Sequence, residues 1–500
     1  MSKSKTRRLL RREAAYSSAK EKDSNVLHTL AYWRQRAEFF GQLTNKKSLL
    51  EAVTARHLGV KSIACRVAGQ DDWIHGSFNV CIPVTVTDHK AGPGKRVIIW
   101  FPLPYRVGES FRPGNADEKL RCEAGTYVWM QTHCPSVPIP QLYGFELSTG
   151  QSFTRLGSLS LLARCFHHLR RLALSALGYP APSNLVPQRS AAPDLGLGYL
   201  VIEYIEKDRG SMLSNTWEER RHEPALRQNL FRGLSQVLLA MARVPVPRIG
   251  SFRINDDSTL TLTNRPLTVM IHEAQNEGIP IDIPRDLTYT SVDAYVRDLL
   301  GLHDTRLRHQ PNAANSKQDC VYQMCALSAM QMISPRVFRR DLHRGPFAFG
   351  LTDLHQSNVL IDADWNVTCV IDLEWACARP IEMLHPPRWL TNQAVDEMDA
   401  KEYGAVHGEF MDVMEEEEGK LPPLDGGDAN GAPTATISSY LRDGWARGTL
   451  WYTVALYCPP GFPQVFYSHI HPREKERDKE EYDKRLREAF DDADEGGGTT

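Results

Sequence analysis

The sequence lacks the marks of several protein classes. Its ten cysteines include no CxxC pair and follow no regular spacing, so a disulfide framework or zinc site is not expected, and reduced, mostly buried thiols are. No uncharged apolar run approaches the roughly 18 residues of a membrane span, so we expect no membrane partner. Lys plus Arg (59) and Asp plus Glu (61) nearly balance. The resulting net charge of −2 gives no chain-wide reason to expect a nucleic-acid partner.

A secretory signal is also missing from the N-terminal residues. The stretch MSKSKTRRLLRREAAYSSAK is basic, but no apolar core follows it. Its Arg and Ser content resembles a mitochondrial presequence, yet Glu13, Glu21 and Asp23 soon interrupt it. We therefore expect a soluble cytoplasmic protein in which residues 1–25 form a flexible basic arm.

The chain is too long for one core, and its character changes along its length. Five hundred residues predict two or three domains, and 42% apolar with 24% charged residues is ordinary for a globular protein. β-Branched and aromatic runs at residues 62–68, 79–87 and 96–101, bounded by turn signals, predict an antiparallel meander. From residue 208 the apolar spacing becomes helical, so the fold class expected is α+β.

These changes give the predicted boundaries. Residues 26–207 are expected to hold the sheet, with leading helices and a helical and loop insertion at residues 156–196. Residues 208–475 are expected to be mainly helical, with an acidic, Gly- and Pro-rich loop at 415–436 that we predict to be disordered. A charged tail at 476–500 completes the chain.

The most informative stretch is residues 349–375, FGLTDLHQSNVLIDADWNVTCVIDLEW. Two short apolar runs, at residues 359–361 and 368–371, predict a β-hairpin. Such a hairpin would bring Asn358 and Asp372 to the same end, with Asp353 on the loop before it.

An acid, an amide and a second acid at these intervals suit phosphoryl transfer. Magnesium prefers hard oxygen ligands, and the transfer needs positioning, charge neutralisation and a carboxylate that orients the attacking hydroxyl. The spacing matches the kinase pattern Asp-x-x-x-x-Asn followed by a metal-binding Asp. The plainer alternative is that Asp353, Asn358 and Asp372 are turn and cap residues, which Asp and Asn also favour.

The stretch LTDLHQSNVLID…VIDLEWA resembles the catalytic motif of the aminoglycoside phosphotransferase and choline-kinase-like family, and in particular a fungal set with uncharacterised substrates. The similarity spans roughly residues 60–390. It implies a bilobal, protein-kinase-like fold with a small antiparallel-sheet N-lobe, a larger helical C-lobe and a nucleotide cleft between them. Further similar segments are Gly76–Asn79, Phe101–Glu109, Cys122–Met130, Ile139–Phe145 and Leu200–Ile205.

The resemblance also implies roles for individual residues. Asp353 becomes the catalytic base, and Asn358 and Asp372 become ligands of Mg²⁺. Glu123 becomes the helix glutamate that pairs with a strand lysine or arginine. The remaining nucleotide contacts would come from the hinge Glu203, Tyr204 and Ile205 and from the phosphate loop Gly76, Ser77, Phe78 and Asn79.

Two departures from the family pattern bear on activity. The basic residue expected on the third strand of the N-lobe falls at Trp100, which cannot neutralise phosphate charge; Lys95, Arg96 and Arg106 are candidate substitutes. The histidine often found two residues before the catalytic aspartate is Leu351 here.

The function expected from these observations is transfer of the γ-phosphate of ATP, with Mg²⁺, to a hydroxyl of a small molecule whose identity the sequence does not show. The alternative is a pseudokinase, a nucleotide-binding or scaffolding module without transfer activity, which Trp100 motivates. A protein kinase is disfavoured because LEWACARPIEM follows Asp372 in place of Phe-Gly and a long activation segment.

Overall fold

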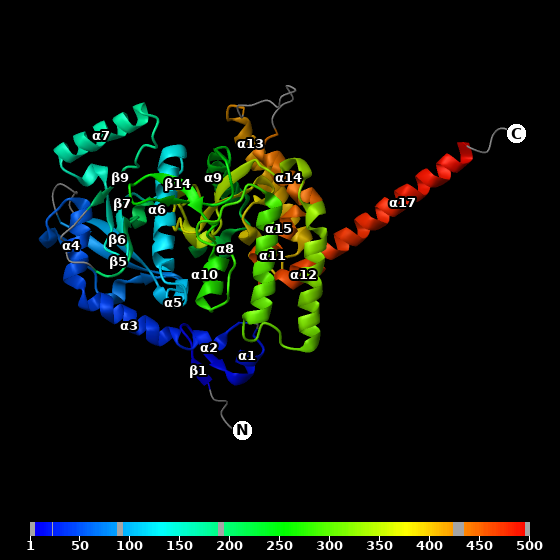
Figure 1. Cartoon of the computed structure of the whole chain (residues 1–500), viewed down its shortest axis with the longest axis horizontal. Helices are drawn as coiled ribbons and strands as arrows, with labels where there is room; N and C mark the ends of the chain where they lie inside the picture. Colours follow the sequence, from blue (N-terminus) through cyan, green and yellow to red (C-terminus); the bar gives the residue numbers. More distant parts are fainter. Residues whose placement is uncertain (1–5, 23, 88–93, 189–194, 424–434, 496–500) are drawn as a thin grey trace.

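The computed structural model describes residues 6–22, 24–87, 94–188, 195–423 and 435–495. Its mixture of helices and antiparallel strands confirms the α+β class. Figure 1 shows an N-terminal part built around one sheet beside a larger part built mainly of helices. We call residues 24–203 the sheet part and residues 208–495 the helical part.

The main sheet has eight strands in the order β3-β5-β6-β10-β7-β8-β9, with β4 paired to β5. Every pair is antiparallel, which confirms the predicted meander and extends it. Strands β7 and β8 form a hairpin within it. The strands are β3 Cys65–Val67, β4 Ile74–His75, β5 Asn79–Val86, β6 Lys95–Pro102, β7 Leu142–Glu146, β8 Ser152–Arg155, β9 Leu185–Gln188 and β10 Tyr199–Glu203.

Helices cover both faces of this sheet. The alternation of side chains along β6 places Val97, Ile99 and Phe101 in one cluster, with the leading helices α3 (Tyr32–Asn45) and α4 (Lys47–Leu58). Trp100 points to the opposite face, into a cluster shared with α6 (Asn115–His133). That second cluster continues into the helical part, so the two parts share one core on this side.

Helix α6 is the central helix of the molecule. It begins after Gly114 and carries Asp117 and Glu118 in its first turn. Strand β13 of the helical part approaches its middle closely, because a Cβ on Gly125 would lie 2.7 Å from the Phe252 carbonyl oxygen. A buried ion pair joins Glu118 at its start to Arg265 at 2.8 Å. Helix α6 is therefore held by residues from both parts.

The N-terminal residues differ from the flexible arm that we expected. A two-stranded antiparallel ladder joins β1 (Thr6–Arg8) to β2 (Glu13–Ala15). Two short helices follow, α1 (Tyr16–Lys20) and α2 (Val26–Thr29).

The insertion contains the expected helix and an unexpected strand. Helix α7 (Leu161–Ala176) packs loosely on the sheet part and has no buried residue, and Figure 1 shows it at the outer edge. Strand β9 then adds to the edge of the sheet beside β8. Residues 189–194 of the expected loop lie outside the described residues.

The helical part adds most of the remaining helices. Strands β13 and β14 form a hairpin, and two three-stranded ladders, β11-β16-β17 and β12-β15-β18, carry the motif region. The elements up to the motif are α8 Trp217–Arg220, α9 Pro224–Ala242, α10 Val269–Asn276, α11 Val292–His309 and α12 Lys317–Val337, with strands β11 Ser211–Met212, β12 Pro245–Val246, β13 Ser251–Ile254, β14 Leu260–Asn264, β15 Phe347–Leu351, β16 Val359–Ile361, β17 Val367–Val370 and β18 Ala376–Pro380.

The C-terminal region corrects one prediction about the acidic segment. Helix α13 (Ala400–Gly419) includes Glu415–Glu418, which we expected to be disordered. The Glu418 carboxylate is buried and accepts hydrogen bonds from the backbone of Ile437 and Ser438 at 2.7 and 2.8 Å, so it caps α14. Residues 424–434 of that segment lie outside the described residues. The helices here are α13, α14 Ile437–Arg447, α15 Thr449–Tyr457, α16 Phe462–Val465 and α17 His471–Glu495.

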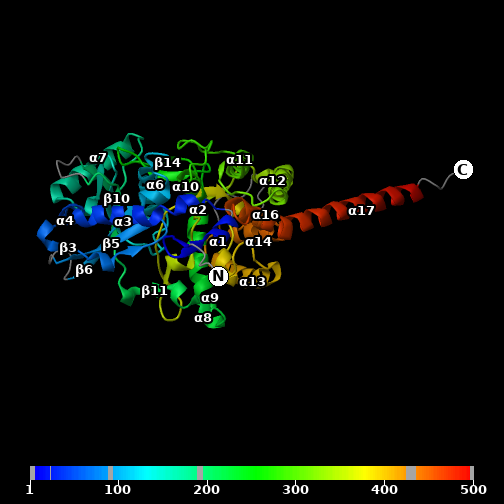
Figure 2. The same ribbon diagram turned by 90° about the horizontal axis from the view of Figure 1, so that it is seen from below.

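Helix α17 forms the charged tail. It projects away from the rest of the molecule in both views (Figures 1 and 2). Six of the ten cysteines are buried, as predicted. Across the described ranges, no helix combines the length and apolarity that a membrane crossing requires.

Candidate active site

The predicted hairpin is present and brings Asn358 next to Asp372. Strands β16 and β17 pair antiparallel with Val359 opposite Val370. At the open end, the backbone N–H of Ile371 donates to the carbonyl of Asn358 at 2.9 Å. The Asn358 amide donates to the Asp353 carbonyl at 3.0 Å, so its side-chain oxygen faces away from that bond. The three motif residues therefore lie together, as the spacing predicts.

Asp353 lies on the loop that follows β15. The pairing of β15 with β18 fixes this loop, and the Thr352 hydroxyl donates to the Trp375 carbonyl at 2.6 Å. Burial and the nearby charge of Glu374 raise the pKa of Asp353 to about 6, and Arg388 opposes them. A carboxyl with this pKa is mainly ionised at neutral pH and can still accept a proton.

Asp372 is held in an unusual backbone conformation. Its φ is +60°, in the left-handed region that few non-glycine residues adopt. Its Oδ1 atom is buried and has no hydrogen-bond partner within the described part of the chain. Burial raises the pKa of Asp372 well above its usual range, and the charges of Glu374 and Glu123 add to that shift. Strain and an unsatisfied carboxylate oxygen together are typical of a ligand-binding position.

A buried lysine supplies the positive charge that Trp100 does not. Lys119 lies on α6, is 1% exposed, and forms an ion pair with Glu374. Its ammonium also lies 3.5 Å from the Glu123 carboxylate, one helical turn further along α6. Burial lowers the pKa of Lys119, but the charges of Glu374, Glu123 and Asp372 together raise it above its ordinary value. Glu123 therefore lies beside a cation of its own helix, in place of the strand lysine or arginine that the resemblance implies.

The three basic residues considered as substitutes lie elsewhere. The Lys95 ammonium sits over the Tyr143 ring at 4.8 Å. Arg96 forms an ion pair with Glu206. The Arg106 guanidinium donates to the Ser77 carbonyl at 2.8 Å, so it contacts the phosphate loop candidate but not the acidic residues.

The segment Gly76–Asn79 folds against the motif. The Phe78 ring meets the Trp375 ring edge to face at 4.6 Å. The Asn79 amide donates to Glu374 at 2.9 Å, and its oxygen accepts from Lys119 at 2.8 Å. Gly76 does not have a positive φ, and a Cβ there would meet no atom within 4 Å, so the backbone does not require glycine. This loop therefore lies beside the acidic cluster, and its role in phosphate binding stays a prediction.

The hinge candidate follows the end of β10. The Glu203 carboxylate accepts from the Gln141 backbone at 3.1 Å, and the Tyr204 N–H donates to the Arg96 carbonyl at 3.4 Å. Within the described residues, the Ile205 N–H has no such acceptor. The role of Ile205 as a hinge donor to a base stays a prediction.

The residues present suit a magnesium ion that is shared with phosphates. The charge of Glu374 helps to raise the pKa of Asp353, Asp372 and Glu123, and Lys119 is a buried cation beside this cluster. In the described ranges, no three His, Cys, Asp or Glu side chains lie close enough to hold an ion by themselves. Asp372 with Asn358 would supply two oxygens and leave the remaining positions to phosphate and water.

Comparison with known proteins adds little. No family model matches the chain, and no curated protein matches it. A solved structure of a macrolide 2'-phosphotransferase type I is similar over 86% of this chain and 97% of its own, at 14% sequence identity and a TM-score of 0.33. At that TM-score the likeness supports no conclusion about function.

Sequence reasoning missed Lys119 and undervalued Glu374. The spacing Lys119-x-x-x-Glu123 on one predicted helix was a usable signal, because residues four apart share a helix face. Glu374 was expected to complete local hydrogen bonds, whereas it joins the sheet part to the helical part through Asn79 and Lys119.

Proposed function

We propose that this protein is an ATP- and magnesium-dependent phosphotransferase acting on a hydroxyl of a small molecule, with a bilobal, kinase-like arrangement of its two parts. The observation that carries the proposal is the convergence of Asp353, Asn358 and Asp372 at one end of a hairpin, beside the buried Lys119. Asn358 and Asp372 would hold the magnesium ion, which when bound neutralises phosphate charge.

The chain's own residues account for the other requirements. Asp353 orients the acceptor hydroxyl and takes its proton, since its carboxylate is ionised above about pH 6. Lys119 places a fixed positive charge beside the phosphates and holds Glu374 in position. Gly76–Asn79, whose Asn79 amide donates to Glu374, would contact the phosphates, and the backbone of Ile205 would contact the base.

Acidic pH should reduce activity through Asp353. Because its pKa is raised, the base form is lost as pH falls through about 6, so kcat/KM should drop about tenfold per pH unit below that value and be flat above it. The measurement is kcat/KM between pH 5 and pH 8, with protein unfolding followed separately. A limb near pH 4, the region of an unperturbed aspartate, would contradict a base whose pKa is raised by burial.

Nucleotide binding separates the proposal from the pseudokinase alternative. The midpoint temperature of thermal unfolding should rise when ATP and magnesium are added. A ligand at a hundredfold excess over its Kd increases the free energy of unfolding by about 2.7 kcal/mol. ADP release with a panel of hydroxylated metabolites should then identify turnover. A metal-dependent shift without turnover of any alcohol would favour the pseudokinase, and no shift at all would exclude both nucleotide-dependent functions.

The buried Lys119 supports the enzyme over the pseudokinase alternative. That alternative was motivated by Trp100, and Lys119 now provides a buried cation on the same side of the sheet. A protein kinase remains disfavoured because strand β18 begins at Ala376, four residues after Asp372, which leaves no length for an activation segment.

A further inference from the structure

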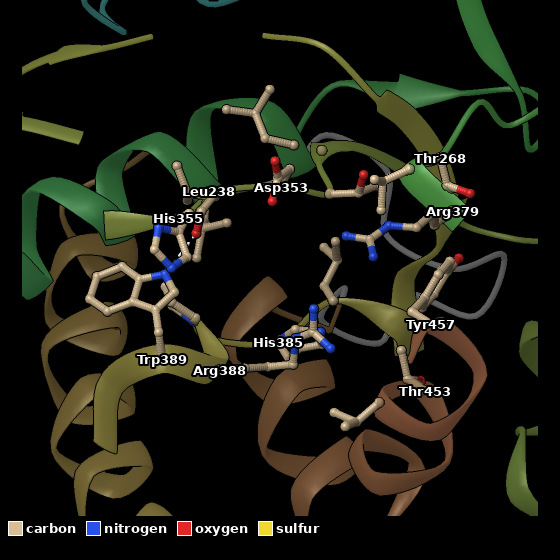
Figure 3. A pocket seen from close by; sticks show the side chains of 18 of the residues that line it. Leu238, Thr268, Asp353, His355, Arg379, His385, Arg388, Trp389, Thr453 and Tyr457 are labelled. Atoms are coloured by element: carbon tan, nitrogen blue, oxygen red, sulfur yellow. Dashed lines mark hydrogen bonds between the residues drawn. The ribbon is translucent and has the colours of Figure 1, made fainter. Parts of the chain in front are cut away.

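A cavity of about 310 Å³ lies on the helical side of Asp353. It is bounded by β15 and β18, by the loop after residue 384 and by helices α9 and α15. Figure 3 shows Asp353 at its edge, with side chains from several elements around it. This volume is at the lower end of the range for small-molecule sites, so the cavity suits a compact acceptor.

Arg379 on β18 is the most unusual residue of this cavity. Its side chain is 7% exposed, and its Nε has no hydrogen-bond partner in the described part of the chain. No carboxylate of the described residues forms an ion pair with it, and its guanidinium lies 5.5 Å from the centre of the Tyr457 ring. Figure 3 shows this guanidinium reaching into the cavity. A buried cation without a counter-charge is unfavourable unless a ligand provides one.

The remaining charges of the lining have the same sign. Arg388 is half-buried and likewise forms no ion pair within the described ranges. His385 adds no charge at neutral pH, because burial lowers its pKa to about 3. Apart from Asp353, the ionised side chains of this cavity are therefore both arginines. An acceptor rich in amino groups would be repelled here.

We propose that the acceptor is an alcohol that also carries an anionic group, a carboxylate or a phosphate ester, which Arg379 and Arg388 bind. Arginine suits either anion, because its planar guanidinium can donate two parallel hydrogen bonds. The carbon body would pack on Leu384 and Trp389, which also line the cavity. This inference rests on the proposed function.

The transfer that this geometry allows is balanced. The acceptor oxygen forms a bond to the γ-phosphorus of ATP, and the bond from that phosphorus to the β–γ bridging oxygen breaks. The hydroxyl proton passes to the Asp353 carboxylate, and ADP leaves. The anionic group on the arginines holds the hydroxyl near Asp353 and takes no part in the bond changes.

Matched probes test the proposal on the full chain without nucleotide, so that nothing is turned over. The probes are 4-(hydroxymethyl)benzoate, 4-(hydroxymethyl)phenyl phosphate, the neutral 1,4-benzenedimethanol and the cationic 4-(hydroxymethyl)benzylamine, with binding followed by saturation-transfer NMR. At least one anionic probe should bind about tenfold more tightly than the neutral diol, the value of one charge-assisted hydrogen bond, and the amine should bind most weakly. Comparing the benzoate with the phenyl phosphate shows which anion is preferred.

Variants assign the preference to the arginines. Arg379→Gln and Arg388→Gln should each weaken the anionic probe about tenfold and leave the diol unchanged. If Arg379→Gln does not fold, Arg388→Gln still tests the proposal, because Arg388 is only half-buried. Three results would each overturn the acceptor class. The first is that the diol or the amine binds as tightly as the anionic probes, or more tightly, and the second is that neither anionic probe binds. The third is that the arginine substitutions weaken binding of the diol as much as binding of the anionic probe.

Failure of this inference can be told apart from failure of the proposed function. A protein that binds the anionic probe but never releases ADP with any alcohol would overturn phosphotransfer and leave the arginine site intact. Phosphorylation of the benzylamine in preference to the benzoate would overturn the anionic acceptor class and leave phosphotransfer intact.

Discussion

An Asp372→Asn protein is expected to lose magnesium-dependent nucleotide turnover by at least about a hundredfold, the loss found when one preorganised electrostatic contact is removed from an active site. Asparagine keeps the size of the side chain and tolerates the left-handed backbone that Asp372 adopts, so the change removes charge without disturbing the hairpin. Alanine at this position would add backbone strain to the same loss.

The same substitution should stabilise the protein when no metal is present. The raised pKa of Asp372 means that folding disfavours its ionised form, so this group makes the folded state less stable as pH rises above the ordinary aspartate value. Removing the ionisable carboxyl should therefore raise Tm at neutral pH while activity falls. ADP release and thermal unfolding on the same preparation measure both effects.

A matched control lies on the same hairpin. Asp364 is exposed on the turn between β16 and β17, so Asp364→Asn should change neither turnover nor Tm appreciably. Undiminished turnover in Asp372→Asn, with Asp364→Asn also active, would remove Asp372 from the site.

Lys119→Met should reduce both turnover and stability. Glu374 and Glu123 would remain buried without their cation, and breaking a buried pair in this way costs about 3–5 kcal/mol. The phosphates would also lose their fixed positive charge, so ATP binding should weaken even in protein that stays folded.

A second substitution separates these two consequences. Trp100 faces the same side of the sheet as Lys119, and its neighbour Cys81 has a pKa raised by burial and by the charges of Asp372, Glu123 and Glu374. In Lys119→Met with Trp100→Lys, a cation returns near these carboxylates from the strand, and ATP-dependent turnover should recover in part. The single substitution Trp100→Lys should lower stability without raising turnover, because it adds a second cation beside Lys119, which is already paired with Glu374. Higher turnover in that single variant would show that Lys119 does not replace the strand cation.

The sequence predicted the hairpin and its three polar residues because their positions depend on local rules. Strand residues flank a turn rich in Asp and Asn, so pairing alone brings Asn358 to Asp372. Strands β5 and β6 of the main sheet were predictable for a similar reason, from their β-branched and aromatic runs.

What the sequence did not predict depends on tertiary contacts. Lys119 looks like one more charged helix residue until α6 is packed between Asn79 and Glu374, and only then is its ammonium enclosed. Arg379 likewise reads as a strand residue until the loop after 384 and helix α15 close around it. The β-ladder within residues 6–22 was not predicted, because each of its strands has only three residues, too few for a recognisable period.

The ion pair of Glu374 with Lys119 would oppose any separation of the sheet part from the helical part. In the kinase template the lysine–glutamate pair joins a strand to a helix within the small lobe. Here the Lys119–Glu123 pair lies within α6, so it does not join that helix to a strand. The ion pair between Lys119 and Glu374 instead connects the sheet part to the helical part, on the side where the two share a core. Moving the parts away from each other therefore means exposing an ammonium and a carboxylate that are now enclosed. In the proposed reaction, this ion pair would slow the departure of ADP more than the transfer itself.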